Sequence, residues 1–291
     1  MRRSRAAWWF VGPALVVIGV FFFLPVLAAL ALSITDFDIY ALADLRNLRL
    51  VGLRNYIELL QTPLFWRALG NTLYFVVVGV PLSMAISLAA ALLLHSRVAR
   101  FKAFFRTALF APVVTTLVAA AVVWRYLFNT RYGWLNYALG GFGIPPIDWL
   151  GDPYWAMPAI IVFAVWKNFG YNMIILLAGL QGIPEELYEA ARIDGASIWR
   201  QFRYVTLPML TPIFVMVNIL TIAGYFQLFA EPYVMTQGGP LHSTVSLVML
   251  MYEQGFRWWR MGRAAAIAFL LFMLMLAATR IQLRLQRERI R

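Results

Sequence analysis

The sequence contains no cysteine, so disulfide bonds, iron–sulfur clusters and zinc sites built on thiolates are excluded. Histidine is almost as scarce: His95 and His242 lie far apart in the chain and have no spacing typical of metal ligands. Neither Lys102 nor Lys167 follows a glycine, so no phosphate-binding loop for ATP is present. There is also no Ser-His-Asp triad or pair of catalytic carboxylates. We therefore expect a chain that is not an enzyme and that binds no cofactor or metal of its own.

Charge is scarce as well. Only 13% of the 291 residues are charged and 62% are hydrophobic, which is typical of an integral membrane protein surrounded by lipid. The net charge of +12 does not indicate a nucleic-acid partner, because the arginines lie beside apolar runs and form no continuous patch.

Long apolar runs predict an all-α polytopic membrane protein with six transmembrane helices in a single domain over residues 1–291. The expected spans are about 8–33, 68–94, 106–127, 154–180, 207–230 and 261–280. A cleaved signal peptide is the alternative interpretation of the first run. Its apolar region would be only ~7–15 residues long, whereas the uncharged run here extends from Ala6 to Thr35.

An even number of spans places both termini on one side of the membrane. Lys and Arg are more numerous in the two tails and in the loops 95–106 and 181–206 than in the loops of the opposite side. Because basic residues favour the cytoplasmic side, we expect both termini and the 181–206 loop to be cytoplasmic.

The 181–206 loop is the long polar interruption between spans four and five. Its helical spacing gathers Leu187, Ala190 and Ala191 on one small, mostly apolar face, and Gly195 permits a turn into a second short helix. An amphipathic linker lying on lipid headgroups is the alternative. The loop begins with acidic residues, including Glu189, whereas helices that lie on lipid usually carry Lys and Arg. A docking site for a partner protein is the favoured interpretation.

Three sequence elements resemble those of permease subunits of ATP-binding-cassette importers. Glu189–Pro208 fits the pattern Glu-Ala-Ala, three residues, Gly, nine residues, then an aliphatic residue, any residue and Leu-Pro. Val205 occupies a position where this cytoplasmic signature usually has isoleucine. Val51–Tyr56 (VGLRNY) and Thr236–Pro240 (TQGGP), with Ser243-Thr244 close behind, are similar to elements of the carbohydrate-uptake group, of the maltose and glycerol-phosphate type.

This resemblance implies a permease subunit that moves a sugar or related polyol across the inner membrane of a prokaryote. It also implies a second permease that is a different chain, two ATPase subunits that hold ATP and Mg²⁺, and a periplasmic or lipid-anchored solute-binding protein. Two coupling helices between spans four and five would dock into the ATPase. The expected coupling residues are Glu189 and Asp194 for polar contacts, Gly195 for the turn, and Leu187, Ala190 and Ala191 for the packed face.

Polar residues inside the spans are candidates for the transport path, because such side chains tend to face the bundle interior or a wet cavity. The candidates are Thr115 and Thr116 in span three, Lys167, Asn168, Tyr171 and Asn172 in span four, and Asn218, Thr221 and Tyr225 in span five. Hydroxyls, amides and aromatic rings suit a sugar. Hydrogen bonding between helices is the structural alternative for each residue. For Lys167, contact with a partner, with water or with an anionic solute stays open.

Two other functions stay open at this stage. An ion-coupled secondary transporter typically has acidic residues deep in its spans and inverted repeats, and neither is evident here. A membrane scaffold that transports nothing is the other. The sequence does not identify the solute: maltose-like oligosaccharides, other glycosides, pentoses and glycerol phosphate all fit.

Overall fold

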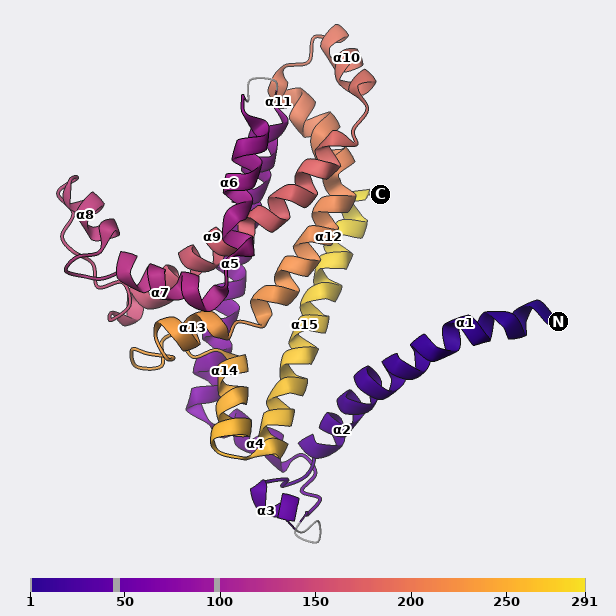
Figure 1. Cartoon of the computed structure of the whole chain (residues 1–291), viewed down its shortest axis with the longest axis vertical. Coiled ribbons are helices and arrows are strands. Elements are labelled where there is room, and N and C mark those ends of the chain that lie inside the picture. Colours follow the sequence, from indigo (N-terminus) through magenta and orange to yellow (C-terminus); the bar gives the residue numbers. More distant parts are fainter. Residues whose placement is uncertain (1, 44–47, 97–99, 291) are drawn as a thin grey trace. The chain divides into compact units, whose positions relative to one another are not determined.

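The computed structural model describes residues 2–43, 48–96 and 100–290. Residues 97–99 of the basic loop and Arg291 of the basic tail lie outside this part. The described residues are helical, apart from turns and one bridge between Thr35 and Leu50. The expectation of an all-α fold is therefore confirmed (Figure 1).

Within the described residues, five helical stretches are long and apolar enough to cross a membrane: Trp8–Ser33, Pro63–His95, Pro153–Gln181, Ile198–Phe226 and Met261–Arg284. The first comprises most of α1 (Arg2–Ile18), a π-helical turn and α2 (Leu24–Ser33), and the second is α5 (Pro63–His95). The third is α9 (Pro153–Gln181). The fourth runs from α11 (Ile198–Gln201) through a π-helical turn into α12 (Leu207–Phe226), and the fifth lies in α15 (Met261–Ile290).

The expected third span is broken. Its halves, α6 (Lys102–Val114) and α7 (Leu117–Leu127), meet at an angle of 100° (Figure 1). Thr115 and Thr116 are extended between them, and the Thr115 hydroxyl donates to the carbonyl of Pro112 at 2.7 Å. Pro112 removes one backbone donor from the last turn of α6, which favours a break at this point. Counting the bent pair as one span gives six.

The chain forms two compact units, residues 1–66 with 247–274 and residues 67–246 with 275–291. In the first unit, VGLRNY leads into α4 (Arg54–Gln61), and its Asn55 amide donates to the carbonyls of Ser33 and Thr35 at 2.9 and 2.7 Å. These carbonyls lie at and just beyond the end of α2, where the helix provides no partner for them. Gly262 passes so close to Thr35 that an added Cβ would lie 2.2 Å from its carbonyl oxygen.

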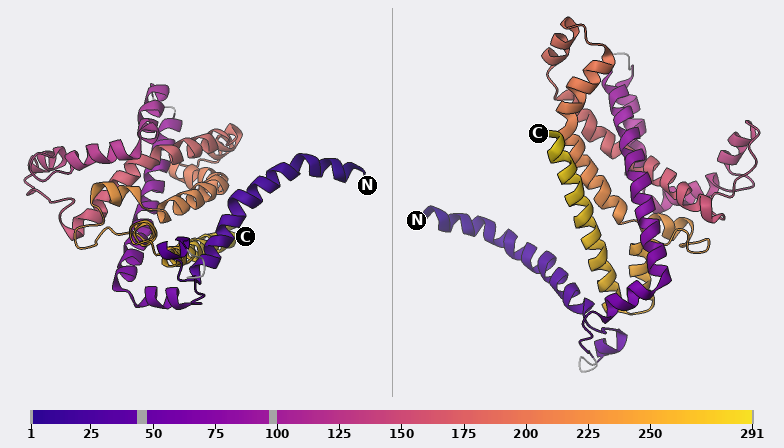
Figure 2. Two further views of the ribbon diagram at one scale, coloured as in Figure 1. Left: turned by 60° about the horizontal axis from the view of Figure 1, so that its bottom comes forward. Right: turned by 180° about the vertical axis from the view of Figure 1, so that it is seen from behind.

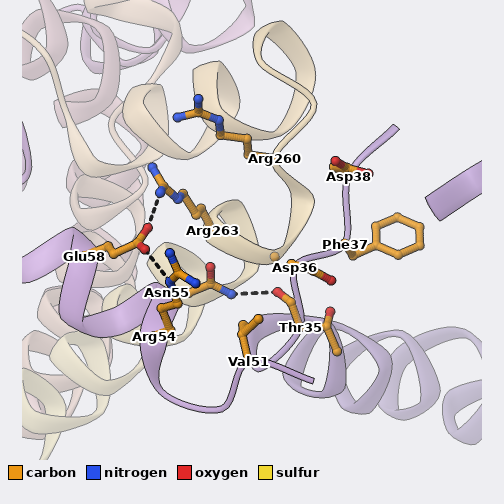
Figure 3. Close-up of a pocket in the computed structure, with 11 residues that line it drawn as sticks. Thr35, Asp36, Phe37, Asp38, Val51, Arg54, Asn55, Glu58, Arg260 and Arg263 are labelled. Carbon is orange, nitrogen blue, oxygen red and sulfur yellow. Dashed lines mark hydrogen bonds and ion pairs between the residues drawn. The ribbon is translucent and has the colours of Figure 1, made fainter. Parts of the chain in front are cut away.

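A polar pocket borders this junction and includes Glu58, whose carboxylate pairs with Arg54 at 2.7 Å and with Arg263 (Figure 3). The hydrogen bond from Arg54 and the charge of Arg263 hold the pKa of Glu58 below its ordinary value, although desolvation opposes them. In this structure VGLRNY therefore joins elements within the first unit.

In the second unit α9 is the central helix, with most of its apolar window buried. Gly170 lets α6 cross closely, since an added Cβ would lie 2.4 Å from the Leu109 carbonyl oxygen. Gly179 does the same for α12, where an added Cβ would lie 2.6 Å from Ile213. Small residues at helix crossings allow such close packing in membranes.

Candidate functional site

A cavity of about 410 Å³ lies within the second unit. It is lined from α5, α6, α9, α12, the segment after α12 and the first turn of α13 (Ala230–Met235). The lining residues are Phe75, Val113, Ala164, Asn168, Tyr171, Asn172, Leu220, Thr221, Gly224, Tyr225, Gln227, Leu228 and Glu231. Amides, hydroxyls and aromatic rings therefore face one space.

Five of the nine candidate path residues line this cavity. Asn168, Tyr171 and Asn172 come from α9, and Thr221 and Tyr225 come from α12. The two helices are joined here, because the Asn172 amide donates to the Thr221 hydroxyl at 3.0 Å. Thr221 in turn donates to the Val217 carbonyl at 2.8 Å.

Aromatic packing forms another part of the wall. The rings of Phe75 and Tyr225 stack with centroids 4.9 Å apart. Gly79 faces the same tyrosine, and an added Cβ there would lie 2.7 Å from the ring. These contacts hold Tyr225 in place beside the cavity.

The other four candidates lie elsewhere. Thr115 and Thr116 are exposed at the bend between α6 and α7, and Asn218 is half-buried one turn before Thr221. Lys167 is only 7% exposed, and its ammonium donates to the Val113 carbonyl at 3.1 Å. It therefore closes the carbonyl end of α6, where a positive charge is favourable.

Glu231 was missed by the sequence analysis, which placed it in the loop after span five. The structure places it in the first turn of α13, half-buried on the cavity wall. Burial raises the pKa of the Glu231 carboxyl, and backbone hydrogen bonds oppose that shift. The sequence carries no pattern that places it there, because α13 is only six residues long.

The segment after α13 is a second ordered feature of this unit. The hydroxyls of Thr236 and Thr244 lie 2.7 Å apart, and Thr244 donates to the Gly239 carbonyl at 2.8 Å. The Asn71 side chain of α5 donates to the carbonyls of His242 and Val245, both at 2.9 Å. The TQGGP element is therefore held against α5.

The 181–206 loop forms the helix–turn–helix that its spacing predicts. Its first helix, α10 (Glu185–Ile193), ends in a Schellman motif: Gly195 has φ +72°, its amide bonds the Arg192 carbonyl, and the Ala196 amide bonds the Ala191 carbonyl at 2.9 Å. The Ser197 side chain then caps α11. Figure 1 and the right view of Figure 2 both show these helices beyond the end of α9.

Large apolar side chains of this loop are exposed. Ile193 is 87% exposed and Ile198 is 86% exposed, and Leu187 and Trp199 are exposed as well. Glu189, Ala190, Asp194 and Gly195 are also exposed, and Ala191 is half-buried. These side chains together form an exposed apolar surface on α10 and α11.

The loop is also tied to the helix that follows it. The hydroxyls of Tyr188 in α10 and Thr206 lie 3.0 Å apart, and Thr206 is buried directly before α12. Arg192 pairs with Glu185 at 3.1 Å on the exposed side of α10. This exposed ion pair contributes little to stability, and both of its residues belong to α10. The contact between Tyr188 and Thr206 is therefore the one that links α10 to the start of α12.

Comparisons with known proteins give the same family for nearly the whole chain. Residues 5–291 match the family described as binding-protein-dependent transport system inner membrane component. The chain is 37% identical to a lactose transport system permease protein of Rhizobium radiobacter, over 97% of this chain and 94% of that protein. It is 34% identical to a trehalose/maltose transport system permease protein of Thermococcus litoralis, over 99% and 96% of the two chains.

The fold is similar to that of a solved bacterial transporter involved in the import of the acidic polysaccharide alginate. The TM-score is 0.79 at 20% identity, with 99% of this chain and 96% of that chain covered. The fold is equally similar, with a TM-score of 0.79, to that of a bacterial alginate transporter solved in complex with an alginate pentasaccharide-bound periplasmic protein. The present chain belongs to the family of binding-protein-dependent transport system inner membrane components and is a multi-pass protein of the prokaryotic inner membrane.

Proposed function

We propose that this chain is the permease subunit of an ATP-driven importer, and that its cavity carries a sugar or related polyol across the inner membrane. The cavity is the observation that carries the proposal: the polar residues Asn168, Asn172 and Thr221 line one space together with Tyr225. Sugars bind to such combinations because their hydroxyls need hydrogen bonds and their C–H faces pack on aromatic rings. The lactose and trehalose/maltose names of the relatives agree with this solute class.

The 181–206 loop is proposed as the contact with an ATPase subunit that holds ATP and Mg²⁺. Exposed Leu187, Ile193 and Ile198 offer apolar surface for a groove, and Glu189 and Asp194 offer polar contacts at its edge. Closure of the ATPases on ATP would move α10 and α11. The Tyr188–Thr206 contact would pass that movement to α12, which lines the cavity.

The orientation follows from this assignment. Since ATP is cytoplasmic, α10 and α11 lie on the cytoplasmic side, together with both termini and the basic loop 95–106. The TQGGP loop then faces outward, where the solute-binding protein docks. A complete transporter would contain this chain, a second and different permease, two ATPase subunits and the solute-binding protein.

The experiment is reconstitution of the purified complex in liposomes with its solute-binding protein. ATP hydrolysis and solute uptake are measured with lactose, maltose, trehalose, arabinose oligosaccharides and glycerol phosphate. We expect one or a few sugars to stimulate both activities, and replacement of Glu189 or Gly195 to reduce the stimulation. The matched control is Gly182→Ala, because Gly182 has an ordinary helical φ of −83° in the same loop.

Other results would support the alternatives. Uptake that follows an ion gradient without ATP would identify a secondary transporter. A complex that contains no ATPase and transports none of the solutes would identify a scaffold. Either result would overturn the proposal.

A further inference from the structure

The charged groups around the cavity bear on whether it binds neutral or anionic sugars, which the fold alone does not indicate. Among the described residues that line it, Glu231 is the only one with a formal charge at neutral pH. The remaining polar lining consists of neutral amides and hydroxyls such as Asn168, Asn172 and Gln227. The lining itself therefore contains a carboxyl group that repels anions, and the cation that interacts with this carboxyl group, Lys167, is not a lining residue.

Lys167 is the cation nearest in sequence to this lining, yet it is committed to another role. Its ammonium bonds the Val113 carbonyl at 3.1 Å, and the side chain is 7% exposed. Gly170, one turn further along α9, lets the α6 backbone approach. The contact with the end of α6 therefore keeps Lys167 out of the cavity lining. To pair with the Lys167 ammonium, an anionic solute would have to break its bond to the Val113 carbonyl.

Glu231 is held in place by its helix. The Tyr233 amide bonds the Phe229 carbonyl at 3.0 Å, and the rings of the same two residues stack with centroids 5.1 Å apart. Pro232 is buried, and α13 packs against α7 and α9. The carboxyl group is thus presented to the cavity from a fixed element.

The ionised form of this carboxyl group is the one that separates neutral from anionic solutes. The ionised group accepts hydrogen bonds from sugar hydroxyls and repels a carboxylate, phosphate or sulfonate. A protonated group would be neutral, as the side chain of glutamine is, and would not repel an anion. An anion that enters this space loses water, and the carboxylate of Glu231 offsets the attraction of Lys167, whose ammonium already bonds the Val113 carbonyl.

On these grounds, and resting on the proposed function, we propose that Glu231 is a specificity-determining residue that makes the cavity accept neutral sugars and reject anionic ones. A solved transporter with a similar fold is involved in the import of an acidic polysaccharide, whereas relatives of this chain are named for lactose and trehalose/maltose. The fold alone therefore does not indicate the charge of the solute. We therefore expect this cavity to bind glycerol phosphate and uronate sugars more weakly than neutral sugars.

The test uses the complete permease–ATPase complex without the solute-binding protein, so that selection by that protein is removed. Binding of lactose, maltose, digalacturonate and glycerol 3-phosphate is measured by titration calorimetry. In the native complex we expect a neutral disaccharide to bind at least about tenfold more tightly than the anionic probes. Glu231→Gln keeps the shape and removes the charge, so this ratio should fall to about threefold or less, chiefly through tighter binding of the anions.

Two further variants make the result specific. Glu253→Gln makes the same chemical change outside the lining residues and should leave the ratio as in the native complex. Lys167→Met tests the competing role of the lysine: loss of anion binding in this variant would assign the anion contact to Lys167 and overturn the proposal. An unchanged ratio in Glu231→Gln would overturn it as well.

Failure of the proposed function gives a different result. If the native reconstituted transporter takes up no sugar with its solute-binding protein and ATP, the proposed function and this inference fall together. If it takes up a neutral sugar but Glu231→Gln leaves the binding ratio unchanged, the inference about Glu231 alone is wrong.

Discussion

The hydroxyl of Tyr188 lies 3.0 Å from that of Thr206, which joins the first helix of the exposed loop to the residue directly before α12. Tyr188→Phe removes this hydrogen bond and keeps the ring. A net contribution of about 1 kcal/mol is typical of such a bond. We expect the number of sugar molecules transported per ATP to fall several-fold with little change in basal hydrolysis, measured in proteoliposomes. Tyr204→Phe is the control, because Tyr204 is exposed; an equal loss in both variants would contradict the role of Tyr188.

Gly195 has a left-handed φ of +72°, and an added Cβ would meet nothing within 4 Å. The cost of a side chain is therefore conformational, about 1–2 kcal/mol for most residues and less for asparagine. Uptake should decrease in the order native, Gly195→Asn, Gly195→Ala, Gly195→Val, with Gly182→Ala close to native. An uptake rate in Gly195→Val equal to the native rate would contradict the requirement for this turn.

Asn172 and Thr221 are hydrogen-bonded across the cavity wall. Asn172→Ala and Thr221→Val should each weaken sugar binding, and their effects should be less than additive because each removes the same contact. The measurement is a double-mutant cycle of sugar affinity by calorimetry. If the changes in binding free energy of the two single variants add up to that of the double variant within about 0.3 kcal/mol, the two side chains act separately.

Glu58 has a pKa below its ordinary value of 4.5 because of Arg54 and Arg263. A carboxyl group whose pKa is depressed in the folded state stabilises the protein above its unfolded pKa, and this contribution is lost as the pH falls through the folded pKa. Thermal unfolding between pH 7 and pH 3 should therefore show a smaller acid-induced decrease in Glu58→Gln than in the native chain. Parallel pH curves for the two would contradict this assignment.

Local features were predictable from the sequence. The helix of the exposed loop and its turn at Gly195 depend on residues close together in the chain, so spacing and glycine chemistry were sufficient. The meeting of Asn172 and Thr221 was anticipated only in part: both were expected to face the bundle interior, but their direct contact depends on how α9 and α12 cross.

Features set by distant contacts were not predictable. Pro112 gives the bend at Thr115 and Thr116 a local cause, but the bond from Lys167 to the Val113 carbonyl and the close packing of α6 on Gly170 come from residues more than fifty positions later. Glu231 reaches the cavity because α13 folds back against α7 and α9, and hydropathy alone assigns it to a loop. VGLRNY was noted as a family resemblance, and only the structure relates its Asn55 to the end of α2.

The broken third span also has a consequence for insertion into the bilayer. Its halves contain 13 and 11 residues, and at about 1.5 Å per residue each covers roughly 20 Å or less of a hydrocarbon layer about 30 Å thick. Neither half is long enough to cross alone as a straight helix, and the carbonyl end of α6 is closed by a lysine that is synthesised later. The contacts that complete this span are therefore available only once α9 has been synthesised and lies beside it.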